Sequence, residues 1–229
     1  MAQEKTFVLS LGGSVMVPEE IDEQFLKKFR DFIFKKTALG YKFVIITGGG
    51  KTCRKYNKVA LNIAKASVLE QDIIGIETTK LNALLLKVIL KEKSNPKLLD
   101  KRGVIKKFKN HKVIVGCGWE PGSSSDFDAV QTAIDFGAKM VINLSNQDYV
   151  YTADPKKDKT ATIIKEINWK DYLKLVPKKW VSGMNTPFDP IASKLAQKNN
   201  IKVIMANGKN LVNLEKIITN KPFIGTIIF

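Results

Sequence analysis

Three clusters of small residues each follow a run of β-branched and other apolar residues. They are Gly12-Gly13-Ser14, Gly48-Gly49-Gly50 and Gly116-Cys117-Gly118. Glycine lets backbone N–H groups approach an oxygen closely, and a helix that starts at such a loop adds positive potential, so these loops suit phosphate. Because the carboxyl ends of parallel strands meet at one edge of a sheet, the three clusters predict a single site for phosphorylated ligands.

Two common phosphate-binding motifs do not fit this sequence. Gly50-Lys51-Thr52 looks like the end of a Walker A loop, but Ile45 stands where its first glycine is needed. A dinucleotide fingerprint that begins at Gly116 fails because Pro121 occupies its third glycine position. The chain must therefore bind phosphate through a different loop arrangement.

Two charged residues near these loops could act on a phosphate. Arg54, one of only three arginines, follows the triple glycine on the first turn of an expected helix. Its guanidinium fork could hold two phosphate oxygens, although a solvated helix residue is the alternative. Asp72 lies in an otherwise apolar stretch and could bind a ligand or simply face solvent.

A second group of candidates lies in the last third of the chain. Asp189 precedes Pro190, which is a good N-cap followed by proline at the first helical position, so capping and catalysis are both open. Lys194 is the candidate cation on the same expected helix. Tyr151 and Asp154 could contact a ligand or merely close a hairpin.

The chemistry that these residues favour is phosphoryl transfer. That reaction needs alignment of the acceptor with the γ-phosphorus and cations to hold the developing negative charge. A phosphate acceptor is already anionic near neutral pH and needs no general base, in keeping with a chain whose only histidine is His111.

The elements that would position these loops alternate along the chain. Buried parallel strands are predicted at 7–11, 42–47, 111–116, 138–145 and 201–206, with a hairpin near 149–154 and a final strand at 225–229. Helices are predicted at 22–38, 69–93, 128–136, 189–199 and 210–219. The expected buried stripe is Phe25, Phe29, Phe32 and Ile33 in the first helix, and Ile73, Ile76, Leu84, Leu85 and Val88 in the second. We expect one α/β domain over residues 1–229 with helices on both faces of the sheet and two lobes that meet near residue 118.

Composition limits the setting and the partners. The formal net charge is +16, which could attract nucleic acid. Arginine is scarce and the lysines are scattered along the chain, which argues against a nucleic-acid partner. An RNA-binding α/β protein stays open as an alternative. No apolar run is long enough to span a membrane and no signal peptide is recognisable, so a cytoplasmic protein with two reduced cysteines is expected.

Taken in order, the motifs resemble the amino-acid kinase superfamily and, within it, the archaeal-type uridylate (UMP) kinases. The resemblance runs from about Phe7 to Ile228 and rests on LGGSVMVPE (11–19), TGGGKTCRKY (47–56), DIIGIETTKLNALLL (72–86), GWEPGSSSDFDAV (118–130), SNQDYVYTADP (145–155) and DPIASKLA (189–196). It departs from the pattern at Ser10, where many members have lysine, and at Tyr149, where glycine is usual.

The resemblance implies a three-layer αβα sandwich with a mostly parallel sheet, an acceptor lobe over about 1–118 and an ATP lobe over about 119–229. It implies transfer of the γ-phosphoryl group of ATP to UMP with Mg²⁺, in a homo-oligomer that is commonly a hexamer, and it assigns no metal-ligating side chains. It places Asp189, Arg54 and Lys194 in catalysis. The implied ATP-binding residues are Gly12, Gly13, Ser14, Gly50, Arg54, Ser145, Asn146, Tyr151 and Asp154. The implied UMP-binding residues are Gly49, Asp72, Gly118, Trp119, Glu120, Pro121, Gly122, Ser123 and Ser124.

Two other functions remain open from the sequence. One is another kinase of the superfamily, such as an isopentenyl phosphate kinase, although those resemble this chain less because they carry a catalytic histidine in the second loop. The other is a non-catalytic homologue that binds a nucleotide or an oxyanion, which Ser10 and Tyr149 favour.

Overall fold

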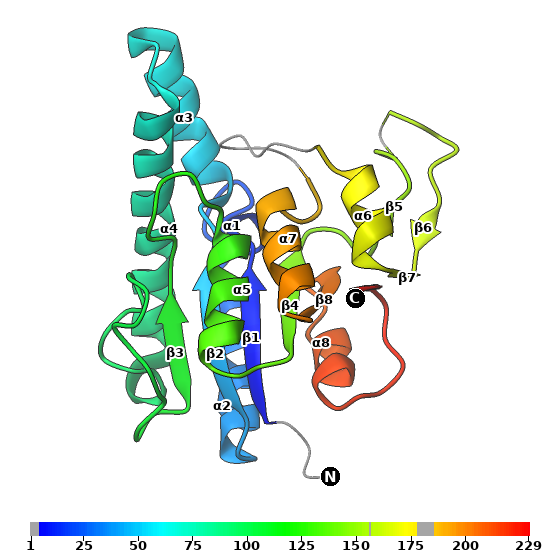
Figure 1. Ribbon diagram of the computed structural model, residues 1–229. Coiled ribbons are helices and arrows are strands. Elements are labelled where there is room, and N and C mark those ends of the chain that lie inside the picture. Colours follow the sequence, from blue (N-terminus) through cyan, green and yellow to red (C-terminus); the bar gives the residue numbers. More distant parts are fainter. Residues whose placement is uncertain (1–4, 156, 178–185) are drawn as a thin grey trace.

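A seven-stranded sheet forms the centre of the protein (Figure 1). The computed structural model describes residues 5–155, 157–177 and 186–229. The strand order is β3-β2-β1-β4-β8-β9-β7, and every neighbouring pair is parallel except β8 and β9. The strands are β1 (Thr6–Leu11), β2 (Lys42–Thr47), β3 (Val113–Gly116), β4 (Met140–Ser145), β7 (Glu166–Ile167), β8 (Lys202–Asn207) and β9 (Thr226–Ile228). The mostly parallel sheet predicted from the sequence is confirmed.

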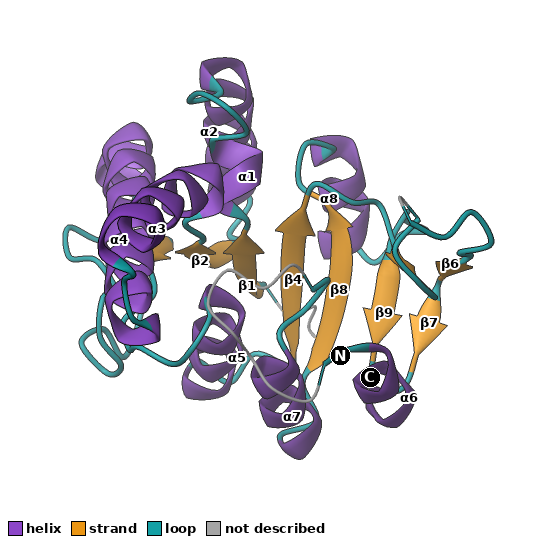
Figure 2. Ribbon diagram, turned by 90° about the horizontal axis from the view of Figure 1, so that it is seen from above, coloured by secondary structure: helices purple, strands orange, loops and turns teal. Residues whose placement is uncertain are grey.

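Helices cover both faces of this sheet, which gives three layers (Figure 2). The core on one face includes residues of α1 (Gly13–Met16), α2 (Glu23–Ala38), α4 (Val68–Leu90) and α8 (Leu211–Ile218). The core on the other face includes residues of α5 (Ser125–Asp135), α6 (Trp169–Leu175) and α7 (Pro190–Lys198). The central strands are buried along almost their whole length because both of their faces are covered.

The helix α3 (Gly50–Ala64) follows the triple glycine directly and packs against α4. A capping box at Ser67 and Glu70 starts α4, and a short 3₁₀ helix, η1 (Lys91–Lys93), follows it. The stripe expected in α2 is confirmed, since Phe25, Phe29, Phe32 and Ile33 are all buried.

The buried face expected for α4 is wrong at three of its five residues, whereas Ile76 and Leu85 are partly buried. Ile73, Leu84 and Val88 are 48%, 41% and 67% exposed. The buried face instead carries Asp72, Thr78, Thr79, Asn82, Ala83, Leu86 and Leu90. Apolar residues occur all around this helix, so hydrophobic periodicity could not identify its buried side, where polar groups meet the glycine loops.

The predicted hairpin exists with different bounds. The strand β5 (Val150–Tyr151) pairs antiparallel with β6 (Ile163–Ile164), so the chain reverses over a longer loop than residues 149–154 allow. The short helices α1 and η1, the helix α6 and the strand β7 were not predicted as elements, although Asn168 is an N-cap for α6. Within the part of the chain that the structure describes, no helix is both long enough and apolar enough to cross a membrane.

Candidate active site

The first two glycine loops meet backbone against backbone at the carboxyl ends of β1 and β2. A Cβ atom on Gly13 would lie 2.2 Å from the Gly50 nitrogen and 2.4 Å from the Gly48 oxygen. The Gly48 N–H donates to the Leu11 carbonyl at 2.9 Å. No side chain fits between these loops, so glycine is required at position 13 by close approach rather than by its dihedral angles.

Arg54 joins the same two loops through its side chain. Its Nη2 donates to the Ser14 Oγ at 3.0 Å, and the residue is otherwise exposed. The sequence prediction that places Arg54, Ser14 and Gly50 near one another is therefore supported by the geometry. The remaining guanidinium donors are available to an anion that binds beside the loops.

The helix α4 holds the second loop from behind. Asn82 donates to the Gly48 carbonyl at 2.8 Å, and Thr47 donates to the Thr79 carbonyl at 2.9 Å. The first bond satisfies a carbonyl group of the loop, and the second ties the end of β2 to the helix. Polar residues on α4 that hydrophobic patterning could not find thus position the loop.

The expected acceptor loop, residues 118–124, is fixed by α4 at both of its ends. The Gly118 N–H donates to Thr79 Oγ1 at 2.9 Å, and the Gly122 N–H donates to Asp72 Oδ2 at 2.8 Å. The loop between them carries Trp119, Glu120 and Pro121, while Ser123 donates to the Glu120 carbonyl and Ser124 caps α5. The structure therefore brings Asp72 and the predicted loop together, and Gly49 lies close to α4 as well, since its added Cβ would be 3.6 Å from the Gly75 oxygen.

Two carboxyl groups lie side by side between the glycine loops and α7. Asp126 Oδ1 accepts from Ser10 Oγ at 3.0 Å and from Asn143 Nδ2 at 2.7 Å, and its Oδ2 accepts from the Asp189 N–H at 3.4 Å. Loss of hydration, together with the charge of Asp189, raises the pKa of Asp126 to about 7. Asp126 was not among the predicted site residues, because a serine N-cap followed by acids in the first helical turn looks like ordinary capping.

Asp189 is held by backbone N–H groups rather than by a lysine. Its Oδ1 accepts from Ile191 and Ala192 at 2.5 and 2.8 Å, and it is 3% exposed. Burial raises the pKa of Asp189 despite these bonds. Lys194, the candidate cation, lies on the exposed side of α7 and takes part in none of the ion pairs of the described residues, so it does not pair with Asp189. Five residues are roughly 1.4 helical turns, which points the two side chains in different directions.

Asp128 is a further buried acid under the acceptor loop. It is 1% exposed, neither of its oxygens has a hydrogen-bond partner of good geometry, and Oδ2 lies 3.5 Å from a Cβ built on Gly118. Burial, together with the charge of Glu120, raises its pKa to about 8. This shift favours the protonated form of Asp128 at neutral pH.

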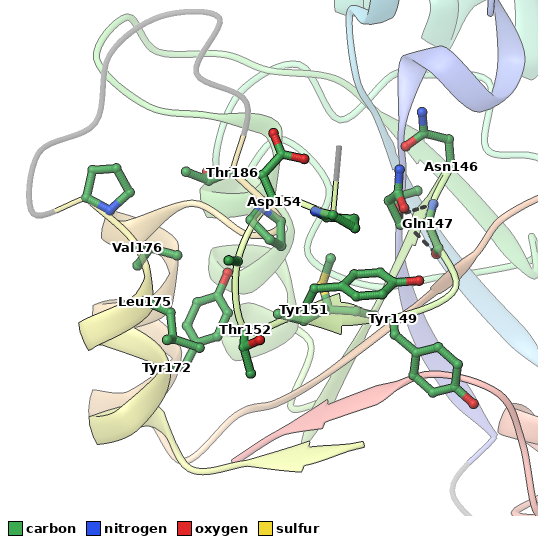
Figure 3. Close-up of a pocket in the computed structure, with 17 residues that line it drawn as sticks. Asn146, Gln147, Tyr149, Tyr151, Thr152, Asp154, Tyr172, Leu175, Val176 and Thr186 are labelled. Carbon is green, nitrogen blue, oxygen red and sulfur yellow. Dashed lines mark hydrogen bonds between the residues drawn. The ribbon is translucent and has the colours of Figure 1, made fainter. Parts of the chain in front are cut away.

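A cavity of about 430 Å³ opens beside these loops, between the β4–β5 turn, α6 and the segment before α7 (Figure 3). Four of the predicted ATP-binding residues line it, namely Ser145, Asn146, Tyr151 and Asp154. Tyr172 closes one side: its hydroxyl donates to the Phe188 carbonyl at 3.0 Å and accepts from the Phe188 N–H at 2.8 Å. Tyr149 also lines this cavity, where the family resemblance leads one to expect glycine.

The first loop connects this cavity with the acceptor side. The Gly12 N–H donates to the Leu144 carbonyl at 2.9 Å, and a Cβ on Gly12 would lie 3.8 Å from the Ser145 Cα. The arrangement is thus a cavity that could hold a nucleoside, a row of glycine loops next to it, and a second loop on the far side. Such an arrangement can align two phosphorylated ligands end to end.

Known proteins match this chain over nearly its full length. The family model described as "Amino acid kinase family" matches residues 5–207. The uridylate kinase of Methanocorpusculum labreanum is 32% identical over 96% of this chain and 94% of its own, and that of Pyrococcus abyssi is 32% identical over 93% and 95%. The crystal structure of uridylate kinase from Archaeoglobus fulgidus aligns with a TM-score of 0.80 at 30% identity, covering 99% of this chain and 100% of that one.

Proposed function

Because the chain belongs to the amino acid kinase family, we propose that it transfers the γ-phosphoryl group of ATP to UMP, giving UDP and ADP. One observation carries this proposal: the acceptor loop is fixed by Asp72 and Thr79 on the opposite side of the glycine loops from the cavity that Ser145, Asn146, Tyr151 and Asp154 line. The proteins that this chain matches over nearly its full length are named uridylate kinases.

In the proposed complex, ATP occupies the cavity of the second half of the chain and UMP occupies the acceptor loop. The N–H groups of residues 13–14 and 49–50 and the guanidinium of Arg54 bind phosphate oxygens between the two. The UMP phosphate needs no proton removed, so the protein contributes alignment and positive potential. Asp189 and Asp126 lie at the junction of the two ligands.

The carboxyl pair fits a divalent cation that arrives with ATP. The buried Asp189 and the half-buried Asp126 have raised pKa values and no cation partner among the ion pairs of the described residues. Mg²⁺ usually takes one or two carboxylates together with substrate phosphates. Among the described residues no group of three or more His, Cys, Asp or Glu could hold a metal, so phosphate oxygens must complete any coordination. When bound, Mg²⁺ would neutralise charge on the transferring phosphoryl group.

Acceptor identity is tested by measuring ADP release from Mg-ATP with UMP, CMP, isopentenyl phosphate, glutamate and carbamate. We expect turnover with UMP to exceed that with every other acceptor. Turnover with isopentenyl phosphate and none with UMP would assign the chain to a different kinase of the family. Binding of both nucleotides without turnover would indicate a non-catalytic homologue, which the Ser10–Asp126 contact in place of a lysine favours.

A homo-oligomer is part of the same proposal. The outer faces of α3 and α4 carry large apolar side chains that are each more than 40% exposed: Tyr56, Val59, Leu61, Ile63, Val68, Leu69, Ile73, Leu81, Leu84 and Val88. So many exposed apolar groups on two packed helices are typical of a protein interface. A second copy of the chain that docks there would bury them, and light scattering of Ile63→Lys and Val88→Lys should show a smaller assembly than the wild type.

A further inference from the structure

Lysine stands at the start of five adjacent parallel strands. Lys42 and Lys202 are the first residues of β2 and β8, while Lys5, Lys112 and Lys139 directly precede β1, β3 and β4. Backbone bonds tie these starts together: Lys42 N–H donates to the Lys5 carbonyl, Phe43 N–H to the Lys112 carbonyl, and Lys202 N–H to the Lys139 carbonyl, at 2.7 to 3.0 Å. The five residues, here called the amino-end lysines, therefore form a row along one edge of the sheet.

This row lies at the opposite end of the strands from the active site. In Figure 1 the arrowheads of β1, β2 and β3 point toward the glycine loops, and the amino ends lie at the other end of the molecule. The carboxyl ends of the same five strands are Leu11, Thr47, Gly116, Ser145 and Asn207, none of them basic. Lysine and arginine make up 38 of 229 residues, so composition alone does not place lysine at five of five strand starts and at none of the ends.

The charge of the row is not neutralised. All five side chains are exposed, and among the described residues none of them forms an ion pair. Lys112 donates to the Thr37 carbonyl and Lys42 lies 5.5 Å from the Phe108 ring centroid, contacts that orient the side chains without removing their charge. Two acids that could have neutralised the row are paired elsewhere, Asp135 with Arg102 and Glu215 with Lys36.

Further lysines extend the same edge. The helices run back against the parallel strands, so their last turns lie near the strand starts, and these turns carry Lys35, Lys87, Lys198 and Lys216. Part of this basic character compensates the negative ends of the helix dipoles. That compensation does not account for lysines on the strands themselves.

We propose that the amino-end lysines bind the phosphodiester backbone of a nucleic-acid duplex, at a site separate from the nucleotide-binding loops. Neighbouring strands are about 4.8 Å apart, so five strands present a row about 20 Å long. A duplex of that length carries on the order of ten phosphate charges. The aromatic residues near this edge, Tyr41 and Phe108, are buried, so stacking with single-stranded bases has no platform, and lysine without arginine reads the backbone rather than the base sequence.

The test is fluorescence anisotropy with labelled 20-bp RNA and DNA duplexes at several salt concentrations. The edge variant Lys42→Gln/Lys139→Gln/Lys202→Gln is compared with the control variant Lys58→Gln/Lys159→Gln/Lys165→Gln, whose lysines are exposed elsewhere and which loses the same net charge. We expect the edge variant to bind a duplex at least tenfold more weakly than the control. The slope of the logarithm of the binding constant against the logarithm of salt concentration should become shallower by about 2 to 3, because each lost phosphate contact removes roughly 0.9. The RNA and DNA arms decide which duplex is preferred.

Four results would overturn the proposal. Equal loss in the edge and control variants would mean that only net charge matters. Displacement of the duplex by saturating UMP and ATP would place it in the active site, and binding to anionic lipid vesicles with none to either duplex would identify a membrane surface instead. Thermal unfolding and ADP release measured on both variants must match the wild type, because none of the six lysines touches the catalytic loops; a loss of catalysis in the edge variant alone would contradict the separation of the two sites.

Discussion

The two ends of the same parallel strands differ in every property that matters for binding. At the carboxyl ends, glycine loops touch backbone to backbone and buried acids have raised pKa values. At the amino ends, exposed lysines stand in a row with no ion pairs among the described residues. The carboxyl ends have close, fixed contacts, which suit the alignment of small ligands. The amino ends have unpaired positive charge, which suits electrostatic binding of a polyanion.

Gly13→Ala should have the largest effect on the carboxyl end. Its new Cβ would overlap the backbone of residues 48–50, and backbone atoms cannot rotate away as side chains can. We expect kcat/KM to fall by more than about 10³ and stability to fall by several kcal/mol. Gly75→Ala is the control, because its Cβ would meet only Cys53 Sγ at 3.6 Å inside a helix, and it should stabilise the protein by about 0.5–1 kcal/mol. Near-native kinetics of Gly13→Ala would show that the loops are not rigidly packed.

Asp189→Asn separates catalysis from helix capping. Asparagine caps a helix about as well as aspartate, so stability should change by only about 0.5 kcal/mol, whereas loss of the charge should lower kcat by a factor on the order of 10²–10³. Asp189→Ala should lose activity and about 1 kcal/mol of stability as well. If the Asn variant keeps full kcat and the Ala variant only unfolds earlier, Asp189 is a cap and has no catalytic role.

Arg54→Ala should reduce kcat/KM by a factor on the order of 10², because it removes the only side chain seen to bridge the first two loops within the described residues. Arg54→Lys should recover part of this loss, since lysine keeps the charge but not the fork. Steady-state kinetics with UMP as the varied substrate measures both. Equal activity of all three proteins would place Arg54 on the solvated surface.

Asp128→Asn should affect the pH dependence of stability more than activity. The Asp128 carboxyl loses its proton near pH 4 in the unfolded chain but holds it to about pH 8 in the folded one, so it contributes a loss of stability as pH rises between these values. Asparagine has no such proton. The free energy of unfolding of the variant, relative to that of the wild type, should therefore rise by a few kcal/mol between pH 5 and pH 9. Denaturant unfolding at both pH values is the measurement, and parallel curves for the two proteins would contradict the buried, unpaired state of Asp128.

The five parallel strands and the glycine loops at the ends of three of them could be predicted from the sequence, because runs such as 42–47 followed by glycine have few other interpretations. The buried side of α4 could not be predicted, because this helix carries apolar residues on all of its sides and its buried side includes the polar residues Thr79 and Asn82. Asp126 was missed for a related reason: local sequence explains it as a capping acid, and only the fold brings Ser10, Asn143 and Asp189 around it. Lys194 was chosen by spacing along a helix, but the cap carboxyl points to the backbone instead.

The most direct test is a crystal structure with UMP, Mg²⁺ and a non-hydrolysable ATP analogue. We expect the adenosine of the analogue in the cavity beside the β4–β5 turn, the UMP ribose at Asp72, and phosphate groups of both ligands at the N–H groups of residues 13–14 and 49–50 with Arg54. The amino-end lysines should contact neither nucleotide. UMP bound away from the acceptor loop, or a nucleotide phosphate at the amino ends of the strands, would contradict these expectations.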